Sequence, residues 1–205
     1  MKFYDIRARP GAYPRWYLKF PVAESGERID ERQFTCGEPY FGPRPRYISL
    51  RRKGPHVDFV LADSDMIVVP RRLNDVLVPL IGSGRAERWP VRVEDEREPM
   101  EILNLLDVVD CIDMRRSDYD VRNEDCRPTL DPQQIRGFGY NGMVIDPERA
   151  SGHKLFRPKG WKIAPVCDDD VRSLLEKERI SGIAFKELAL SPDAPLNQDY
   201  SSNQR

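Results

Sequence analysis

The sequence lacks any long apolar run, which excludes a helix that spans a membrane. Such a helix needs roughly 20 consecutive apolar residues, and no stretch of the chain approaches that length. Residues 1–20 mix charged, aromatic and proline residues, so they do not resemble a secretory signal. We therefore expect a cytoplasmic protein without a membrane partner.

Histidine and cysteine are scarce, which limits the catalytic and metal chemistry of the chain. Neither of the two histidines has a flanking motif, and no G-x-S-x-G sequence occurs, so a serine hydrolase is disfavoured. The four cysteines form no C-x-x-C pair, so we expect free, buried thiols. A zinc site would need widely spaced residues that match no known signature: Cys111, Cys126, His153 and Cys167. We expect neither a metal nor a cofactor.

Phosphate-binding loops and clear catalytic carboxylates are also missing. The segment 137–142, GFGYNG, has the spacing of G-x-G-x-x-G, but it follows no expected strand and opens no expected helix. Asp110 and Asp113 flank Cys111 in an apolar run, where a carboxylate is costly unless it is hydrogen-bonded. A catalytic pair is one interpretation, and aspartates that satisfy backbone groups are the more common outcome. We therefore predict that the protein is not an enzyme.

The clearest secondary structure is a helix that begins at Asp168. Asp168 can accept a hydrogen bond from the first helical turn, and the acidic pair 169–170 suits the positive end of the helix dipole. One apolar stripe follows at helical spacing: Val171, Leu174 and Leu175. Ser181-Gly182 supplies a stop, because glycine adopts the left-handed conformation easily. The segment 183–188 is then expected to form a strand.

An earlier stretch, 66–93, repeats this strand–helix–strand pattern. Pro70 fits the first position of a helix, and apolar residues follow at helical spacing: Leu73, Val76, Leu77 and Leu80. A shift of 98 residues lays Leu73 on Val171 and Leu77 on Leu175. We therefore predict an α+β fold with mixed or antiparallel sheets and a few short helices, in which two similar strand–helix–strand units pack together.

Three segments lack a regular pattern. Residues 36–56 contain four prolines and three glycines, which disfavour a long helix or a central strand, so we expect an exposed loop. Residues 114–137 are polar and are also expected to form a loop. Residues 191–205 are expected to form a mobile tail. The predicted organisation is one α+β domain over 1–190, with 1–95 and 96–190 as candidate halves.

Several short motifs in a fixed order resemble those of a known family. They are Arg15–Leu18 (RWYL), Asp58-Phe59 with Leu61–Asp63 (DF and LAD), Val109–Asp113 (VDCID), Phe156–Trp161 (FRPKGW) and Gly182–Phe185 (GIAF). Together they resemble the Myxococcus-type immunity-protein family of bacterial polymorphic toxin systems, formerly described as a domain of unknown function. The resemblance covers residues 2–188. It implies a non-catalytic cytoplasmic α+β protein that binds and neutralises a cognate toxin protein encoded nearby.

The resemblance also informs individual segments. The run 100–113, MEILNLLDVVDCID, fits either a helix with one polar face or a long twisted strand, and the resemblance favours the strand. No toxin contact can be carried over from the family. Its motifs instead mark residues that we expect to determine the fold: Trp16, Asp110, Asp113, Phe156 and Trp161.

Two charged segments are candidate partner surfaces. The chain as a whole is balanced, with 33 basic and 34 acidic residues, so nucleic acid is not a favoured partner. Fast capture of a protein partner favours local charge complementarity. One candidate is the basic–aromatic loop 40–53, with Arg44, Arg46 and Tyr47. The other is an acidic patch that would suit a basic nuclease: Asp118, Asp120, Glu124 and Asp125.

The loop 40–53 also supports an alternative function. Basic residues interleaved with aromatic ones can form a platform for single-stranded nucleic acid, so a sensor of nucleic acid or of a small molecule is the alternative. Salt-dependent binding to oligonucleotides would reveal it. Formation of a homo-oligomer stays open.

Overall fold

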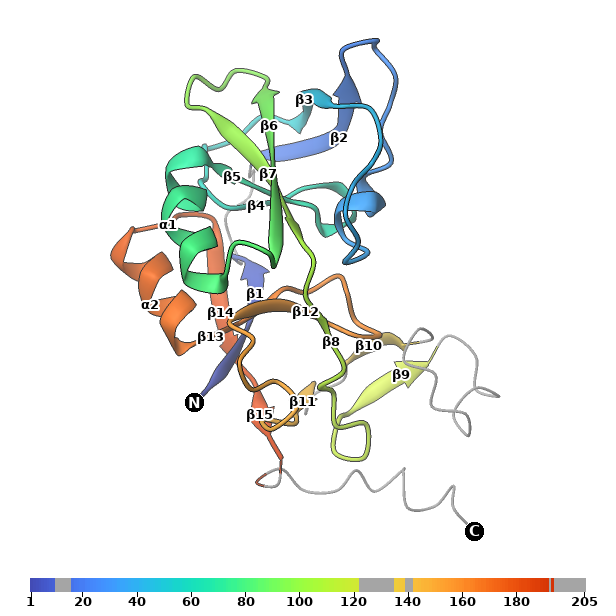
Figure 1. The fold of residues 1–205 in the computed structure, drawn as a ribbon, viewed down its shortest axis with the longest axis vertical. Coiled ribbons are helices and arrows are strands. Elements are labelled where there is room, and N and C mark those ends of the chain that lie inside the picture. The colour runs from blue at the N-terminus through green and yellow to red at the C-terminus, as the bar shows by residue number, and fades with distance from the viewer. Residues whose placement is uncertain (10–15, 122–134, 139–141, 192, 194–205) are drawn as a thin grey trace.

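Two mixed β-sheets, each joined to one helix, make up most of the chain (Figure 1). The computed structural model describes residues 1–9, 16–121, 135–138, 142–191 and 193. This arrangement confirms the predicted α+β fold.

The first sheet has six strands in the order β2-β3-β6-β7-β5-β4. Their bounds are β2 Tyr17–Ala23, β3 Pro45–Arg52, β4 Val60–Leu61, β5 Ile67–Pro70, β6 Ala86–Val93 and β7 Met100–Leu105. The second sheet has five strands in the order β14-β1-β13-β12-β8. Their bounds are β1 Phe3–Ala8, β8 Val108–Val109, β12 Leu155–Pro158, β13 Val166–Asp168 and β14 Ile183–Glu187.

Smaller elements complete the fold. Two short strand pairs are β9 (Tyr119–Val121) with β10 (Ile135–Phe138), and β11 (Val144–Ile145) with β15 (Ala189–Leu190). The helices are α1 (Arg71–Ile81) and α2 (Asp169–Lys177), and the 3-10 turns are η1 (Glu31–Phe34) and η2 (Asp63–Asp65). Among the described residues, no helix is long and apolar enough to cross a membrane.

The two sheets contain the same strand–helix–strand unit. In the first unit, β5, α1 and β6 follow one another, and β7 lies between the two strands because it pairs antiparallel with both. In the second unit, β13, α2 and β14 follow one another, and β1 lies between the strands in the same way. β4 and β12 pair antiparallel with β5 and β13 and complete the first and second units. The predicted pair of similar units is therefore confirmed, with the N-terminal β1 completing the C-terminal unit.

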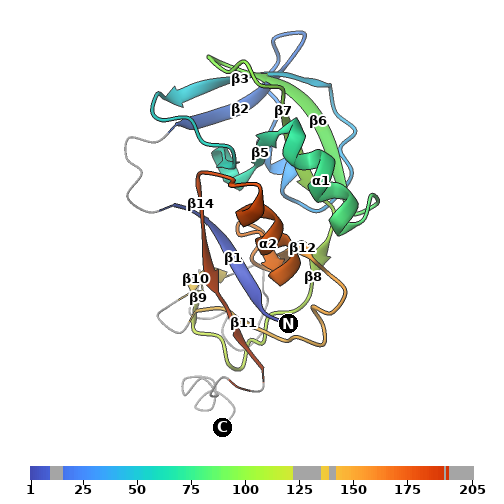
Figure 2. The same cartoon turned by 90° about the vertical axis from the view of Figure 1, so that its left-hand side faces the viewer.

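The two units pack together through their helices. α1 lies beside α2 in both views of the molecule (Figures 1 and 2). Leu73 and Leu77 of α1 share one buried core with Val171 and Leu175 of α2. These residues correspond under the shift of 98 residues seen in the sequence. Removal of their apolar surface from water stabilises the packing of one unit on the other.

Each unit also docks its helix–strand loop on the other unit. Ser181, after α2, hydrogen-bonds Asp58, which lies just before β4. Arg85, after α1, donates to the carbonyl of Gly152 at 2.9 Å, just before β12. Inside the units, two backbone hydrogen bonds also correspond, with donor before acceptor: Arg9 to Gly182 in the second unit, and Leu106 to Arg85 in the first. The contact between the units therefore has approximate two-fold character.

A buried arginine adds a further link between the units. Arg157 of β12 is completely buried and donates to the carbonyl of Asp65, in η2, at 2.9 Å. It also donates to the carbonyl of Lys162. Burial disfavours the charged guanidinium and lowers the pKa of Arg157 to about 10. The Arg157 side chain thus holds the second unit against the connection between β4 and β5.

The ends of α2 are defined by capping. The side chain of Asp168 accepts a hydrogen bond from the N–H of Val171 at 3.0 Å, as the sequence predicts. At the other end, Arg179 adopts a left-handed φ of 52°. The N–H groups of Arg179 and Ile180 then donate to carbonyls of the last turn, which is a Schellman motif. The predicted stop at Gly182 is therefore wrong, because Arg179 takes the left-handed position and Gly182 belongs to the next turn.

α1 confirms the predicted second helix, and its buried face is turned slightly from the predicted stripe. Leu73, Leu77 and Ile81 are buried at a spacing of four residues. Val76, which the sequence pattern places on the apolar stripe, is 41% exposed. Pro70 is extended and precedes the first helical residue instead of occupying it. Leu73 and Leu77 were assigned correctly, and packing on α2 and on the sheet buries Val78 and Ile81 in place of Val76.

Two segments that were expected to be loops contain strands. Within 36–56, β3 pairs with β2 on one side and with β6 on the other, so this expectation is wrong. Pro45 is the first residue of β3, where a missing N–H is tolerated. Within 114–137, β9 and β10 pair antiparallel. The run 100–113 contains β7 and β8, which confirms the extended conformation favoured for it.

Candidate functional site

A groove lies where the β6–β7 turn meets the starts of β3 and α1. Its volume is about 520 Å³. Five arginines line it: Arg44, Arg46, Arg71, Arg92 and Arg97. Three glutamates share the lining: Glu24, Glu96 and Glu98. We call this feature the arginine groove.

Strand pairing gathers the arginines from separate parts of the chain. β3 and β6 run parallel with Tyr47 opposite Arg92, which places Arg46 on the strand next to Arg92. Arg71 is the first residue of α1, and its N–H donates to the carbonyl of Pro99 at 2.8 Å. The start of α1 is thereby fixed to the connection between β6 and β7.

Most guanidinium groups in the groove are unpaired. Among the described residues, the side chains of Arg44, Arg46, Arg92 and Arg97 are exposed, donate no hydrogen bond and form no ion pair. Arg71 differs, because its Nε lies 3.1 Å from a carboxylate oxygen of the buried Glu101. A guanidinium carries five N–H donors in a rigid plane. The four unpaired side chains therefore present many unused donors to solvent.

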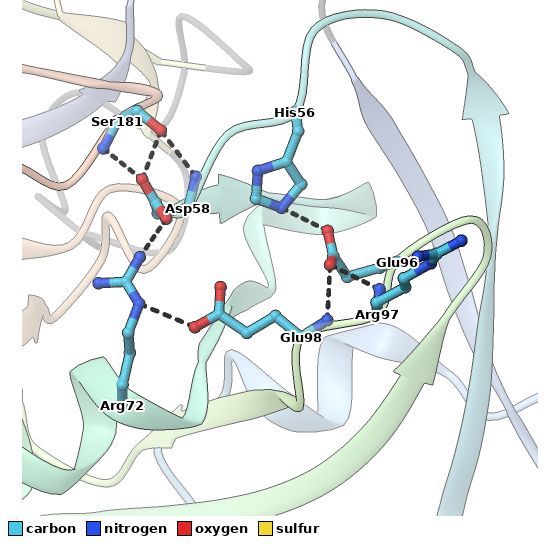
Figure 3. Close-up of polar contacts among 7 residues, drawn as sticks. All are labelled: His56, Asp58, Arg72, Glu96, Arg97, Glu98 and Ser181. Carbon is cyan, nitrogen blue, oxygen red and sulfur yellow. Dashed lines mark hydrogen bonds and ion pairs between the residues drawn. The ribbon is translucent and has the colours of Figure 1, made fainter.

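The carboxylates of the groove are largely engaged by other groups. Glu96 Oε2 lies 2.6 Å from His56 Nε2. Its other oxygen accepts the backbone N–H groups of Arg97 and Glu98 at 2.6 and 2.7 Å. Glu98 accepts from Arg72 Nε at 2.8 Å, and the Arg97 side chain extends away from this pair (Figure 3). The charge that the groove offers to a partner is therefore positive.

A polar cluster beside the groove joins the two units (Figure 3). Asp58 accepts hydrogen bonds from the N–H of Ser181 at 2.9 Å, from its hydroxyl at 2.5 Å and from Arg72 at 2.5 Å. Burial raises the pKa of Asp58, but the hydrogen bonds from Ser181 and the charge of Arg72 outweigh it, so this pKa lies below its usual value. The cluster fixes the α2–β14 loop to the start of α1.

The same geometry does not assemble a serine-type catalytic relay. Such a relay places an imidazole between the hydroxyl and the carboxylate. Here the Ser181 hydroxyl donates directly to Asp58. The ring of His56 faces Glu96 instead, and it packs against Trp16 with ring centroids 4.9 Å apart. Asp58 and Ser181 therefore act on each other as a structural clamp.

The two aspartates singled out as a candidate catalytic pair have different surroundings. Asp110 is exposed and lies 3.2 Å from Lys159 Nζ. Asp113 accepts from Arg116 at 2.9 Å and from the hydroxyl of Ser191. Burial raises the pKa of Asp113, but these bonds outweigh it and the pKa is lowered. Within the described ranges, no three His, Cys, Asp or Glu side chains gather as a metal site requires.

The three aromatic residues that the family motifs mark as fold determinants lie in or near the core. Trp16 and Phe156 are buried. Phe156 packs edge-on against Phe3, with ring centroids 5.9 Å apart. Trp161 is only partly buried and packs on the core around Phe156. These positions favour a structural role for the three side chains.

Sequence reasoning found only part of the groove. It singled out Arg44 and Arg46, which line the groove, and Tyr47, which is half-buried outside the lining. It missed three residues that come from a helix, a strand and a turn: Arg71, Arg92 and Arg97. The pairing of β3 with β6 brings Arg92 and Arg97 to Arg46, and the hydrogen bond to Pro99 brings Arg71 to the same turn. No local pattern in the sequence reports these contacts.

The acidic candidate surface lies elsewhere. Asp118 directly precedes β9, and Asp120 is part of that strand. β9 lies at the far end of the molecule from the β6–β7 turn (Figure 1). Glu124 and Asp125 fall outside the described residues. The acidic patch therefore stays a prediction, and its described part lies far from the β6–β7 turn (Figure 1).

A comparison with protein families identifies the family to which the chain is similar. Residues 19–189 match the model of the Immunity protein family (Imm11). A search of curated proteins finds no match. The matched range includes both helices and every residue that lines the arginine groove. Because this range covers most of the chain, the protein belongs to the Imm11 family of immunity proteins.

Proposed function

We propose that this chain is an immunity protein that binds a toxin protein encoded nearby and blocks its activity in the cytoplasm of the producing cell. The match to the Imm11 family over residues 19–189 carries this proposal. In this proposal, protection comes from binding and not from catalysis. The toxin remains chemically intact and is released when the complex dissociates.

A binding inhibitor has to meet physical requirements that differ from those of an enzyme. A stable complex buries roughly 800 Å² on each partner, with a few well-anchored side chains supplying most of the affinity. A rigid platform lowers the cost of ordering side chains on binding. The sheet of the first unit, held to the second unit by a shared core and by Asp58, is such a platform.

The test is co-expression of this chain with the large open reading frame next to its gene. We expect the neighbouring product alone to arrest growth, and growth to return when this chain is present. The two proteins should copurify as a complex of fixed stoichiometry. In the matched control, an immunity protein whose own toxin is unrelated replaces this chain, and we expect it not to restore growth.

Titration in vitro separates binding from catalysis. A stoichiometric inhibitor reaches full inhibition only when its concentration equals that of the toxin. An enzyme that modifies the toxin would protect at much lower amounts and would change the mass of the toxin. Catalytic protection, or a toxicity that this chain leaves untouched, would overturn the proposed function.

A further inference from the structure

The arginine groove concentrates positive charge that the chain itself does not neutralise. Arginines on other faces, such as Arg51, Arg85 and Arg88, each have a carboxylate partner within 2.8 Å. In the groove, four exposed arginines have no such partner among the described residues. Like charges in one concave surface repel one another, so the arrangement is unfavourable until an anionic group binds.

The chemistry of guanidinium selects the ligand class. Its planar fork forms paired hydrogen bonds with carboxylates and phosphates, which gives orientation as well as attraction. Arg46 and Arg92 come from neighbouring strands of a sheet, so their backbone positions are fixed before binding. Arg97 is positioned by the hydrogen bonds that Glu96 makes to the β6–β7 turn.

We infer that the arginine groove receives a carboxylate-rich segment of a partner protein, namely an acidic loop or helix end of the toxin. This inference rests on the proposed function. The toxin segment would place its Asp or Glu side chains between Arg46, Arg92 and Arg97. A volume of about 520 Å³ accommodates a few side chains and not a whole folded domain.

The lining favours an acidic protein segment over nucleic acid. Platforms for single-stranded nucleic acid combine basic residues with aromatic rings on which bases stack. The described lining contains arginine, glutamate, proline, valine and methionine but no aromatic residue. The net charge of −1 gives no general attraction for nucleic acid either.

The decisive experiment reverses charge in the groove and measures binding to the toxin from the neighbouring gene. The Arg46→Glu/Arg92→Glu variant should weaken binding by about 100-fold or more and reduce its dependence on salt. The matched control, Arg32→Glu/Arg115→Glu, makes the same change in net charge at exposed arginines outside the groove lining. The control should change binding by less than about threefold.

Folding does not confound this comparison. The side chains of Arg46 and Arg92 donate no hydrogen bond within the described chain, so the Arg46→Glu/Arg92→Glu variant, like the control, should keep the circular dichroism spectrum and melting temperature of the parent. A milder variant, Arg46→Gln/Arg92→Gln, removes charge without reversing it and should give an intermediate loss of affinity. Wild-type affinity in the Glu variant would overturn the inference.

Two probes separate failure of the groove from failure of the proposed function. An oligo-glutamate peptide and an oligothymidylate of similar charge are tested against the full chain at low salt. If the peptide binds through Arg46 and Arg92 but no toxin complex forms, the groove is supported as a site for acidic peptides and the proposed function is overturned. Oligothymidylate binding that depends on the same arginines and exceeds peptide binding would replace the inference with a nucleic-acid site.

Discussion

The two strand–helix–strand units share a topology but differ in what surrounds it. In both units a third strand lies antiparallel between the two strands that flank the helix. Both helices contribute to one core. β14 of the second unit ends its sheet, whereas β6 of the first unit continues into β3 and β2. The added strands of the first unit build one side of the arginine groove.

Charge follows the same division. Charged side chains of the second unit are largely paired with one another, as in Lys2–Glu187 at 2.9 Å, Lys154–Asp170 at 2.5 Å and Arg172–Glu176 at 2.8 Å. Four arginines without a carboxylate partner among the described residues gather in the arginine groove, on the first unit and its added strands. The comparison teaches that the repeated unit builds the shared core, while the strands added to one copy build one side of the arginine groove.

The shared core gives the largest expected effect and the most direct way to break the comparison. Leu77→Ala and Leu175→Ala remove corresponding leucines that are both essentially buried. Each should lower the free energy of unfolding by about 2–5 kcal/mol, because apolar contacts are lost and a cavity is left. Urea denaturation measures the change. Val76→Ala, at an exposed position of the same helix, is the control and should cost little.

Similar losses at the two leucines would support two equivalent halves of one core. If Leu77→Ala were severe and Leu175→Ala nearly neutral, α2 would be an attachment to a core that the first unit builds alone. The two units would then share topology without sharing their role in stability.

The docked loops give the next largest effect. Asp58→Ala should cost about 1–3 kcal/mol, because the N–H of Ser181 loses its acceptor and Arg72 loses a carboxylate. Asp107→Ala removes the carboxylate that joins Arg85, at 2.8 Å, to His153 Nδ1, at 2.9 Å and just before β12 of the second unit, and we expect a similar loss. Lys154→Ala, at a surface ion pair, is the control and should cost less than about 1 kcal/mol. A neutral result at Asp58 with a large loss at Asp107 would contradict the reciprocal docking.

Acid should weaken the Asp58 clamp selectively. The pKa of Asp58 is lowered in the folded chain, so the folded state favours the charged carboxylate. Its stabilising contribution is present above the unfolded pKa, near 3.9, and is lost as pH falls through the folded pKa. The difference in unfolding free energy between the parent and Asp58→Asn should therefore shrink below about pH 4. A difference that stays constant down to the lowest measurable pH would exclude a charged clamp.

Local signals in the sequence account for the predictable part of the fold. The helix at 169–177 follows from Asp168 and the apolar spacing, because capping and amphipathicity are local properties. The similarity of the two units also follows from local spacing. The presence of strands in 100–113 needed the family resemblance, because periodicity there fits a helix equally well.

Long-range pairing accounts for what local patterns could not predict. β3 is a strand because β2 and β6 flank it, although the surrounding segment 36–56 is rich in proline and glycine. Arg92 and Arg97 join Arg46 only through that pairing, so the groove has no motif. The turn at Arg179 was also missed, because arginine rarely adopts a positive φ without a surrounding hydrogen-bond pattern.

The ends of the two helices give the smallest effect and the finest comparison of the units. α1 ends at Gly82 with a φ of 102°, whereas α2 ends with Arg179 at a φ of 52°. Arg179→Gly should stabilise the protein by up to about 1 kcal/mol, because glycine tolerates this conformation and the exposed Arg179 side chain has no described partner to lose. Lys177→Gly, two residues earlier in the helix, is the control and should destabilise by about 1 kcal/mol. Thermal melts measure both changes, and destabilisation by both substitutions would mean that α2 does not end in the left-handed turn that makes it comparable with α1.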